Sequence, residues 1–196
     1  MTLLIYTMLC IILPNVVWQL CHINKNTKSV SHIVWTFIFM IYLSFALYVA
    51  EIGSIWDVMT YKRFMGAINT HPFAEGGLVP DILNIIMFMP LGFLLPLNWS
   101  NFRKCWKVAL TGLGFSAIIE FCQLFNNRIT DVDDLIMNTL GACAGYFVWV
   151  LFTKFMENGK NENIKKRAIV KLKTEPIMCI ALGVMGECLL YNWRFV

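Results

Sequence analysis

The stretch SAIIEFCQLFNNRITDVDDLIMNTLGACAGY, residues 116–146, begins and ends like a membrane-spanning helix. Between its apolar ends it holds acidic, basic and amide side chains, namely Glu120, Gln123, Arg128, Asp131, Asp133, Asp134 and Asn138. Ionisable groups are costly at membrane depth and usually face a bundle interior or a water-filled pocket. The stretch therefore predicts two neighbouring spans whose polar faces are turned toward each other or toward water.

The composition of the whole chain points to a membrane protein. Hydrophobic residues fill 58% of the 196 positions, and charged residues fill only 14%. Soluble domains are about half apolar and about a quarter charged. The fold class expected from this composition is all-α: a polytopic membrane helical bundle in which residues 1–196 form a single membrane domain.

Apolar runs long enough to span a membrane define six expected helices. They cover residues 3–20, 33–50, 82–97, 107–125, 134–153 and 177–193. The third run is short and contains Pro90, Gly92 and Pro96. Backbone breaks at membrane depth survive where protein or a water-filled cavity covers the freed groups. We therefore expect a distorted third span that lines a cavity.

The distribution of Lys and Arg sets the expected orientation. Twelve of the 16 basic residues fall in the loops after the first, third and fifth spans. Because cytoplasmic loops are enriched in Lys and Arg, these loops are expected inside the cell and both termini outside. The basic run 160–173 lacks aromatic residues and contains an acidic one, which favours contact with anionic lipid headgroups over nucleic-acid binding.

Two loops are then expected on the outer face. In loop 51–81, the segment IWDVMTYKRFMGAI (residues 55–68) alternates apolar and charged residues in a pattern that suits a short interfacial helix. The second loop lies within the quoted stretch. Because both loops face the same side of the membrane, they can meet.

Helical spacing places the polar residues of three spans at one level. Asp81 and Asn84 are three apart at the outer end of the third span, as are Glu120 and Gln123 in the fourth. Asp134 and Asn138 lie one turn apart in the fifth. Gly141 and Gly145 follow them, and this pair allows another helix to approach closely.

Three residues form the core of the predicted site. Glu120, Arg128 and Asp134 are expected to meet around a cavity open to the outer leaflet, roofed by loop 51–81 and floored by the broken third span. For Asp131 and Asp133, capping of the following helix is favoured over a ligand role. An alternative for Arg128 is a structural ion pair with Glu120 or Asp134.

These residues resemble the signature of the VanZ-like family of bacterial membrane proteins. PDILNIIMFMPLGFLLPL (residues 80–97) is followed by IIEFCQLFNNRITDVDDLIMNTLGACAGY (residues 118–146), and NTHPF (residues 69–73) precedes both. The resemblance covers about residues 72–146. It implies a multi-pass protein of the bacterial plasma membrane that gives low-level resistance to teicoplanin-type glycopeptides, without implying a reaction. The signature positions are Asp81, Asn84, Pro90, Gly92, Glu120, Gln123, Arg128, Asp131, Asp134, Asn138 and Gly141, with Asp133 as an additional acid.

Three functions remain open from the sequence. The first is a binding protein whose polar pocket engages a membrane lipid or lipid-linked envelope precursor, and a lipoglycopeptide directly or indirectly; Arg128 would bind phosphate. The second is an enzyme, with Glu120 as general base beside Asp134, or with Mg²⁺ held by Asp131, Asp133 and Asp134. The third is a structural membrane subunit. No cofactor is expected, and the oligomeric state is left open.

Overall fold

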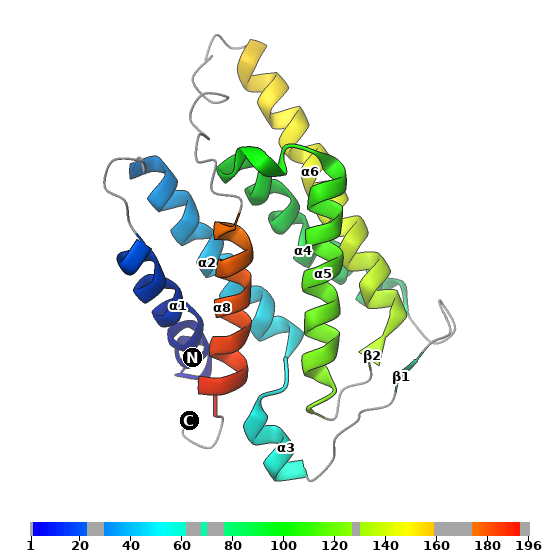
Figure 1. Ribbon diagram of the computed structural model, residues 1–196. Coiled ribbons are helices and arrows are strands. Elements are labelled where there is room, and N and C mark those ends of the chain that lie inside the picture. Colours follow the sequence, from blue (N-terminus) through cyan, green and yellow to red (C-terminus); the bar gives the residue numbers. More distant parts are fainter. Residues whose placement is uncertain are drawn as a thin grey trace.

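The protein is an all-α bundle in a computed structural model that describes residues 2–22, 30–61, 68–69, 77–126, 130–158 and 174–192 (Figure 1). Its helices are α1 (Thr2–His22), α2 (Val30–Ala50), α3 (Ile55–Tyr61), α4 (Leu78–Asn98), α5 (Cys105–Gln123), α6 (Val132–Asn158) and α8 (Glu175–Leu190), with a 3-10 turn η1 (Ser100–Phe102). Two short strands, β1 (Ile68–Asn69) and β2 (Thr130–Asp131), pair in parallel. The expected membrane helical bundle is confirmed. Of the short helix predicted in residues 55–68, α3 confirms the first half, residues 62–67 lie outside the described residues, and Ile68 belongs to β1.

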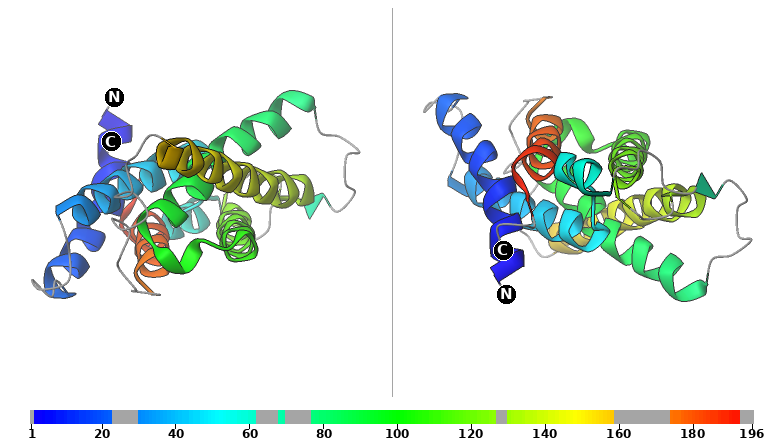
Figure 2. Two further views of the ribbon diagram at one scale, coloured as in Figure 1. Left: turned by 90° about the horizontal axis from the view of Figure 1, so that it is seen from above. Right: turned by 90° about the horizontal axis from the view of Figure 1, so that it is seen from below.

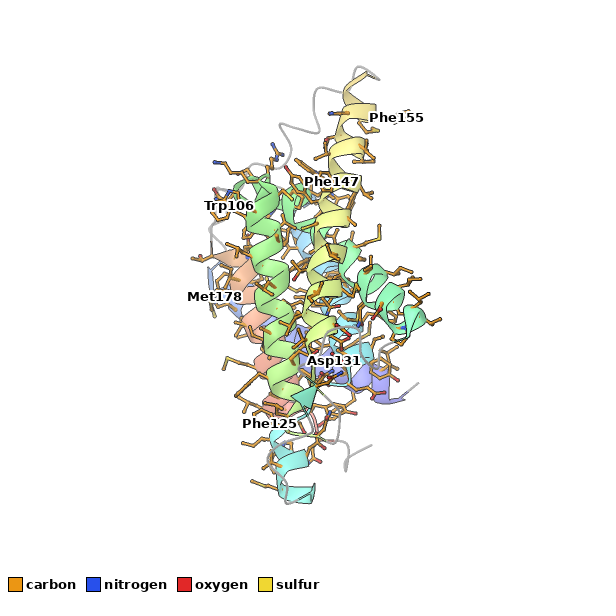
Figure 3. The ribbon with its side chains drawn as sticks, turned by 90° about the vertical axis from the view of Figure 1, so that its right-hand side faces the viewer. Trp106, Phe125, Asp131, Phe147, Phe155 and Met178 are labelled. Atoms are coloured by element: carbon orange, nitrogen blue, oxygen red, sulfur yellow. The ribbon has the colours of Figure 1, made fainter. Side chains whose placement is uncertain are left out.

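Each of the six expected spans corresponds to a helix, and five of those in the described part of the chain are long and apolar enough to cross a membrane. The exception, α8, has 16 residues. At 1.5 Å per residue it extends about 24 Å, less than the roughly 30 Å of a hydrocarbon core. Large apolar side chains cover the outside of the bundle; Trp106, Phe147 and Phe155 project from it in Figure 3 and are 57%, 57% and 79% exposed.

The bundle has two ends with different contents. One end, here called the α3 end, carries α3, the β1–β2 pair, the start of α1 and the end of α8 (Figure 1). The opposite end carries η1 and is called the η1 end. The helix ends that flank the three basic loops lie at the η1 end. This arrangement agrees with the expected alternation of loops, and the side of the membrane that each end faces stays a prediction.

The backbones of α4 and α6 touch along the predicted glycine face. A methyl group added to Gly141 would meet the carbonyl oxygen of Ile85 at 2.4 Å, and one added to Gly145 would meet that of Met89 at 1.9 Å. On the facing helix, a methyl group on Gly92 would meet the Ala142 carbonyl oxygen at 1.9 Å. Small residues thus let the two helices cross at backbone contact, as the sequence predicted. Figure 2 shows α6 lying across α4 in both end views.

The expectation of a short, broken third span is wrong. The helix α4 runs without interruption from Leu78 to Asn98 with Pro90 and Pro96 inside it. A proline lacks an N–H and displaces the carbonyl one turn earlier, so nearby groups must supply replacement donors. The Tyr42 hydroxyl of α2 donates to the Met87 carbonyl at 3.0 Å, next to the Ile86 carbonyl that Pro90 leaves without its helical donor. The helix α4 is therefore bound by α2 beside this proline and stays continuous where its sequence alone indicates a break.

A buried polar network joins four helices at the η1 end. Glu175, at the start of α8, is fully buried, and its Oε2 lies 2.9 Å from Nε2 of His32. The same oxygen accepts from the indole N–H of Trp99 at 2.9 Å, and Oε1 accepts from the Gln19 amide at 2.9 Å. Because each carboxylate oxygen has a partner, this acid locks α1, α2, α8 and the end of α4 together.

The seven cysteines are all free. Two of them nevertheless meet between helices, since the Sγ atoms of Cys122 on α5 and Cys188 on α8 lie 3.4 Å apart. They act there as small apolar side chains that allow α5 and α8 to pack at the α3 end.

The α4–α6 crossing predicts opposite effects for two glycine substitutions. Gly145→Ala should lower stability by about 1–3 kcal/mol, because the new methyl group would collide with the Met89 carbonyl and could be accommodated only if the two helix backbones moved apart. Gly114→Ala on α5 should keep or raise stability, because nothing lies within 4 Å of the added methyl group. Thermal unfolding of both purified variants checks this, and equal melting temperatures would contradict the backbone contact.

Candidate functional site

The site is built where α5 ends and α6 begins. Glu120, in the last turn of α5, is 4% exposed, and its Oε2 accepts the backbone N–H of Asp131 at 3.2 Å. Its carboxyl group also lies within hydrogen-bonding range of the Asp134 carboxyl in the first turn of α6. The two acids at the centre of the predicted site therefore meet. Two carboxyl groups at this range need a proton, a cation or a basic group between them.

The helix α4 is the third element of the site, after α5 and α6. The side-chain amide of Asn84 donates to Oδ1 of Asp134. This contact follows from the glycine crossing, since Asn84 lies one residue before Ile85, which touches Gly141. Deeper in the bundle, the Asn138 amide donates to the Ser116 hydroxyl at 2.9 Å, and that hydroxyl lies 3.5 Å from the Asp134 carbonyl oxygen. Polar groups of α4, α5 and α6 thus form one connected cluster.

The two loops that were expected on the outer face meet over this cluster. In the parallel β1–β2 pair, Ile68 is opposite Thr130 and Asn69 is opposite Asp131. The Asn69 amide donates to Oδ2 of Asp131 at 3.2 Å, and Oδ1 of Asp131 accepts the backbone N–H of Asp133 at 3.0 Å. Asp131 is therefore the N-cap of α6, the role that its position predicted. Figure 3 shows Asp131 beside the start of α6, far from Phe155 near the other end of that helix.

The remaining predicted residues have separate places. Gln123 donates through Nε2 to the carbonyl of Ala50 at 2.8 Å and so ties the end of α5 to the end of α2. Asp133 is 2% exposed, and Asp81 lies half-buried one turn before Asn84. Arg128, the third member of the predicted core, lies outside the described residues, so its contact with Glu120 or Asp134 stays a prediction.

The described part of the site is rich in hydrogen-bond acceptors. Besides the carboxyl groups, Oδ1 of Asn138 and Oε1 of Gln123 are buried without a hydrogen-bond partner among the described residues. A buried acceptor that lacks a donor costs about 1–3 kcal/mol, which a donor-rich ligand would recover. No three acidic, Cys or His side chains in the described ranges converge as a metal ion would require, and Asp131, Asp133 and Asp134 do not form such a group.

Sequence reasoning missed two members of the cluster. Ser116 precedes Glu120 by one helical turn and so shares its face, a spacing that was visible in the sequence. Asn69 lies in the NTHPF segment, but nothing in the sequence indicated that this segment pairs in register with Thr130 and Asp131.

Comparisons with known proteins agree on one family. The sequence profile of the VanZ/LLP1 family matches residues 1–153. Among curated proteins, Protein VanZ of Enterococcus faecium is 31% identical over 113 residues, which cover 57% of this chain and 68% of that protein. No solved structure is significantly similar.

Contact between the two carboxyl groups predicts coupled effects on stability. Glu120→Gln and Asp134→Asn should each relieve the same repulsion, so their effects on the free energy of unfolding should differ from additivity by about 0.5–3 kcal/mol. A double-mutant cycle measured by thermal unfolding checks this. Glu120→Gln combined with Glu157→Gln, at the far end of α6, is the control and should be additive within about 0.5 kcal/mol. Additivity in both pairs would show that Glu120 and Asp134 do not meet.

Proposed function

Because the chain belongs to the VanZ/LLP1 family, we propose that it is a bacterial plasma-membrane protein giving low-level resistance to teicoplanin-type lipoglycopeptides. The Glu120–Asp134 cluster, together with Arg128, is the functional site responsible for resistance. It faces outward and engages a lipid-linked envelope component or a lipid headgroup near which such an antibiotic anchors. Resistance follows from this engagement, whether or not the antibiotic itself is touched.

One observation carries this proposal: five polar residues of the signature gather into one cluster although their burial is costly, namely Asn84, Glu120, Asp131, Asp134 and Asn138. A structural role alone is a weak reason for it, because a hydrogen bond between membrane helices contributes about 0.6 kcal/mol on average. The close α4–α6 packing at Gly141 and Gly145 already fixes the helices without Glu120 or Asp134. The acids are therefore available for recognition.

The chemistry of the cluster favours a ligand with many hydrogen-bond donors. Its carboxyl groups and unpaired amide oxygens accept hydrogen bonds, as sugar hydroxyls and peptide N–H groups of an envelope precursor would require. Arg128 adds a guanidinium suited to a phosphate of the same lipid-linked molecule. Together these groups match a lipid phosphate that bears a sugar or a peptide.

Contact between Glu120 and Asp134 also supports a second candidate function. A pair of carboxyl groups that share a proton can act as acid and base, so the site would modify the lipid or precursor instead of only binding it. Mass spectrometry of membrane lipids and precursors, in cells with and without the protein, separates the two functions. A new covalent species favours the enzyme, and unchanged species favour binding.

Single substitutions test the site in cells. Glu120→Gln, Arg128→Lys and Asp134→Asn should each return teicoplanin susceptibility to that of a strain lacking the protein, because each keeps the side-chain size and removes the recognition chemistry. Immunoblots of membranes must show unchanged abundance. Glu157→Gln is the matched control and should retain resistance.

Two results would contradict the proposal. Full resistance in all three site variants would show that these residues do not form the functional site. Loss of resistance that follows loss of protein would make the cluster a structural lock.

A further inference from the structure

A polar cavity lies at the α3 end, with a volume of about 530 Å³. Its lining comes from the start of α1, the end of α2, α3, the turn after α5 and the end of α8. Glu120 and Asp134 do not line it. The cavity and the Glu120–Asp134 cluster are neighbours, since Gln123 and Asn126 at the end of α5 bind the Ala50 and Glu51 carbonyls at the cavity's edge.

Glu187 is the feature of this cavity that needs an explanation. It lies in the last turn of α8, is 4% exposed, and its Oε2 has no hydrogen-bond partner among the described residues. The fully buried Thr7 hydroxyl, also in the lining, lies beside this carboxyl group and likewise has no hydrogen bond of good geometry among the described residues. A buried carboxyl oxygen without a partner is expensive, and more so at membrane depth. A ligand in the cavity would supply what it lacks.

The charge of the lining selects the ligand's charge. Glu51, Asp57 and Glu187 all line the cavity, and among the described residues no Lys, Arg or His does. Asp57 is held in place as part of the cap of α3, because its Oδ2 accepts from the Ser54 backbone N–H at 2.7 Å and hydroxyl at 2.9 Å. The chain as a whole has a formal net charge of +4, so this acidic lining runs against its composition. A cation is the matching ligand.

The walls favour an organic cation over a metal ion. Tyr48 and Tyr191 line the cavity, and aromatic rings attract ammonium groups. The acids are too dispersed for one metal ion, since no metal-type grouping of acidic, Cys and His side chains occurs among the described residues.

The rim of the cavity is held in an unusual conformation. Glu51 has φ of 48°, the one positive value at a non-glycine residue in the described ranges. Such a conformation costs on the order of 1 kcal/mol and persists where the surroundings enforce it. The Asn126 amide, which donates to the Glu51 carbonyl at 2.7 Å, supplies that restraint and keeps this exposed acid at the mouth.

We propose that this cavity binds an organic ammonium group, with Glu187 as its buried counter-charge and Asp57 and Glu51 toward the mouth. The group comes from a phospholipid headgroup or from a small soluble amine. This site is separate from the Glu120–Asp134 cluster and does not depend on the function proposed for it.

Calorimetry measures the binding of ammonium probes to the full-length protein in detergent, and this tests the proposal. The soluble probe pair is 2-phenylethylamine against 2-phenylethanol, which differ by the ammonium group. The lipid pair is dihexanoyl-phosphatidylethanolamine against dihexanoyl-phosphatidylglycerol. At least one ammonium probe should bind roughly tenfold or more tightly than its uncharged or anionic partner, as a buried charge-assisted contact implies. A preference in the lipid pair alone identifies a headgroup, and one in the soluble pair alone identifies a free amine.

Glu187→Gln should abolish this preference, while Glu157→Gln, outside the cavity, should keep it. The comparison of probes on the unmodified protein needs no variant, so it decides the matter even where Glu187→Gln fails to fold. Equal binding within both probe pairs, no binding of either ammonium probe, or a preference that survives Glu187→Gln would each overturn the proposal.

Discussion

Backbone contact between α4 and α6 sets the positions of the polar residues at the α3 end. Because Gly141 and Gly145 have no side chain, the carbonyls of Ile85 and Met89 lie against α6 itself. Asn84 is consequently held against Asp134, and Asp134 against Glu120. A side chain at either glycine would push α4 outward and separate these groups. The polar cluster depends in this way on residues that carry no chemistry of their own.

Buried polar groups at the two ends differ in how many of their hydrogen bonds are made. At the η1 end, both oxygens of Glu175 are bound by His32, Trp99 and Gln19, and the network closes on itself. At the α3 end, Asn138, Gln123 and Glu187 each leave an oxygen unpaired within the described residues. Satisfied groups stabilise a fold, whereas unsatisfied ones await a ligand. This difference supports the proposal that the protein acts through its α3 end.

Local sequence rules predicted the elements and the central contact of the cluster, but not the features set by tertiary packing. Helical spacing brought Glu120 and Asp134 together, and the capping rule identified Asp131. Pro90 led to a wrong prediction of a break, because the contacts that support α4 beside it, such as the Tyr42 hydroxyl on the Met87 carbonyl, come from another helix. Glu187 was overlooked although an acid within an apolar span is itself a signal. The pairing of Asn69 with Asp131 and the αL conformation of Glu51 depend on contacts between distant segments, which no local pattern encodes.

An action on the outer leaflet requires the α3 end to face the outside of the cell. Labelling of intact cells with a membrane-impermeant maleimide measures it directly, using Asp131→Cys at the α3 end and Ser100→Cys at the η1 end, with the unmodified protein as background for its own cysteines. The charge bias of the loops predicts that Asp131→Cys is labelled in intact cells and Ser100→Cys only after the cells are permeabilised. The reverse pattern would place the polar cluster in the cytoplasm and contradict an action on the outer leaflet.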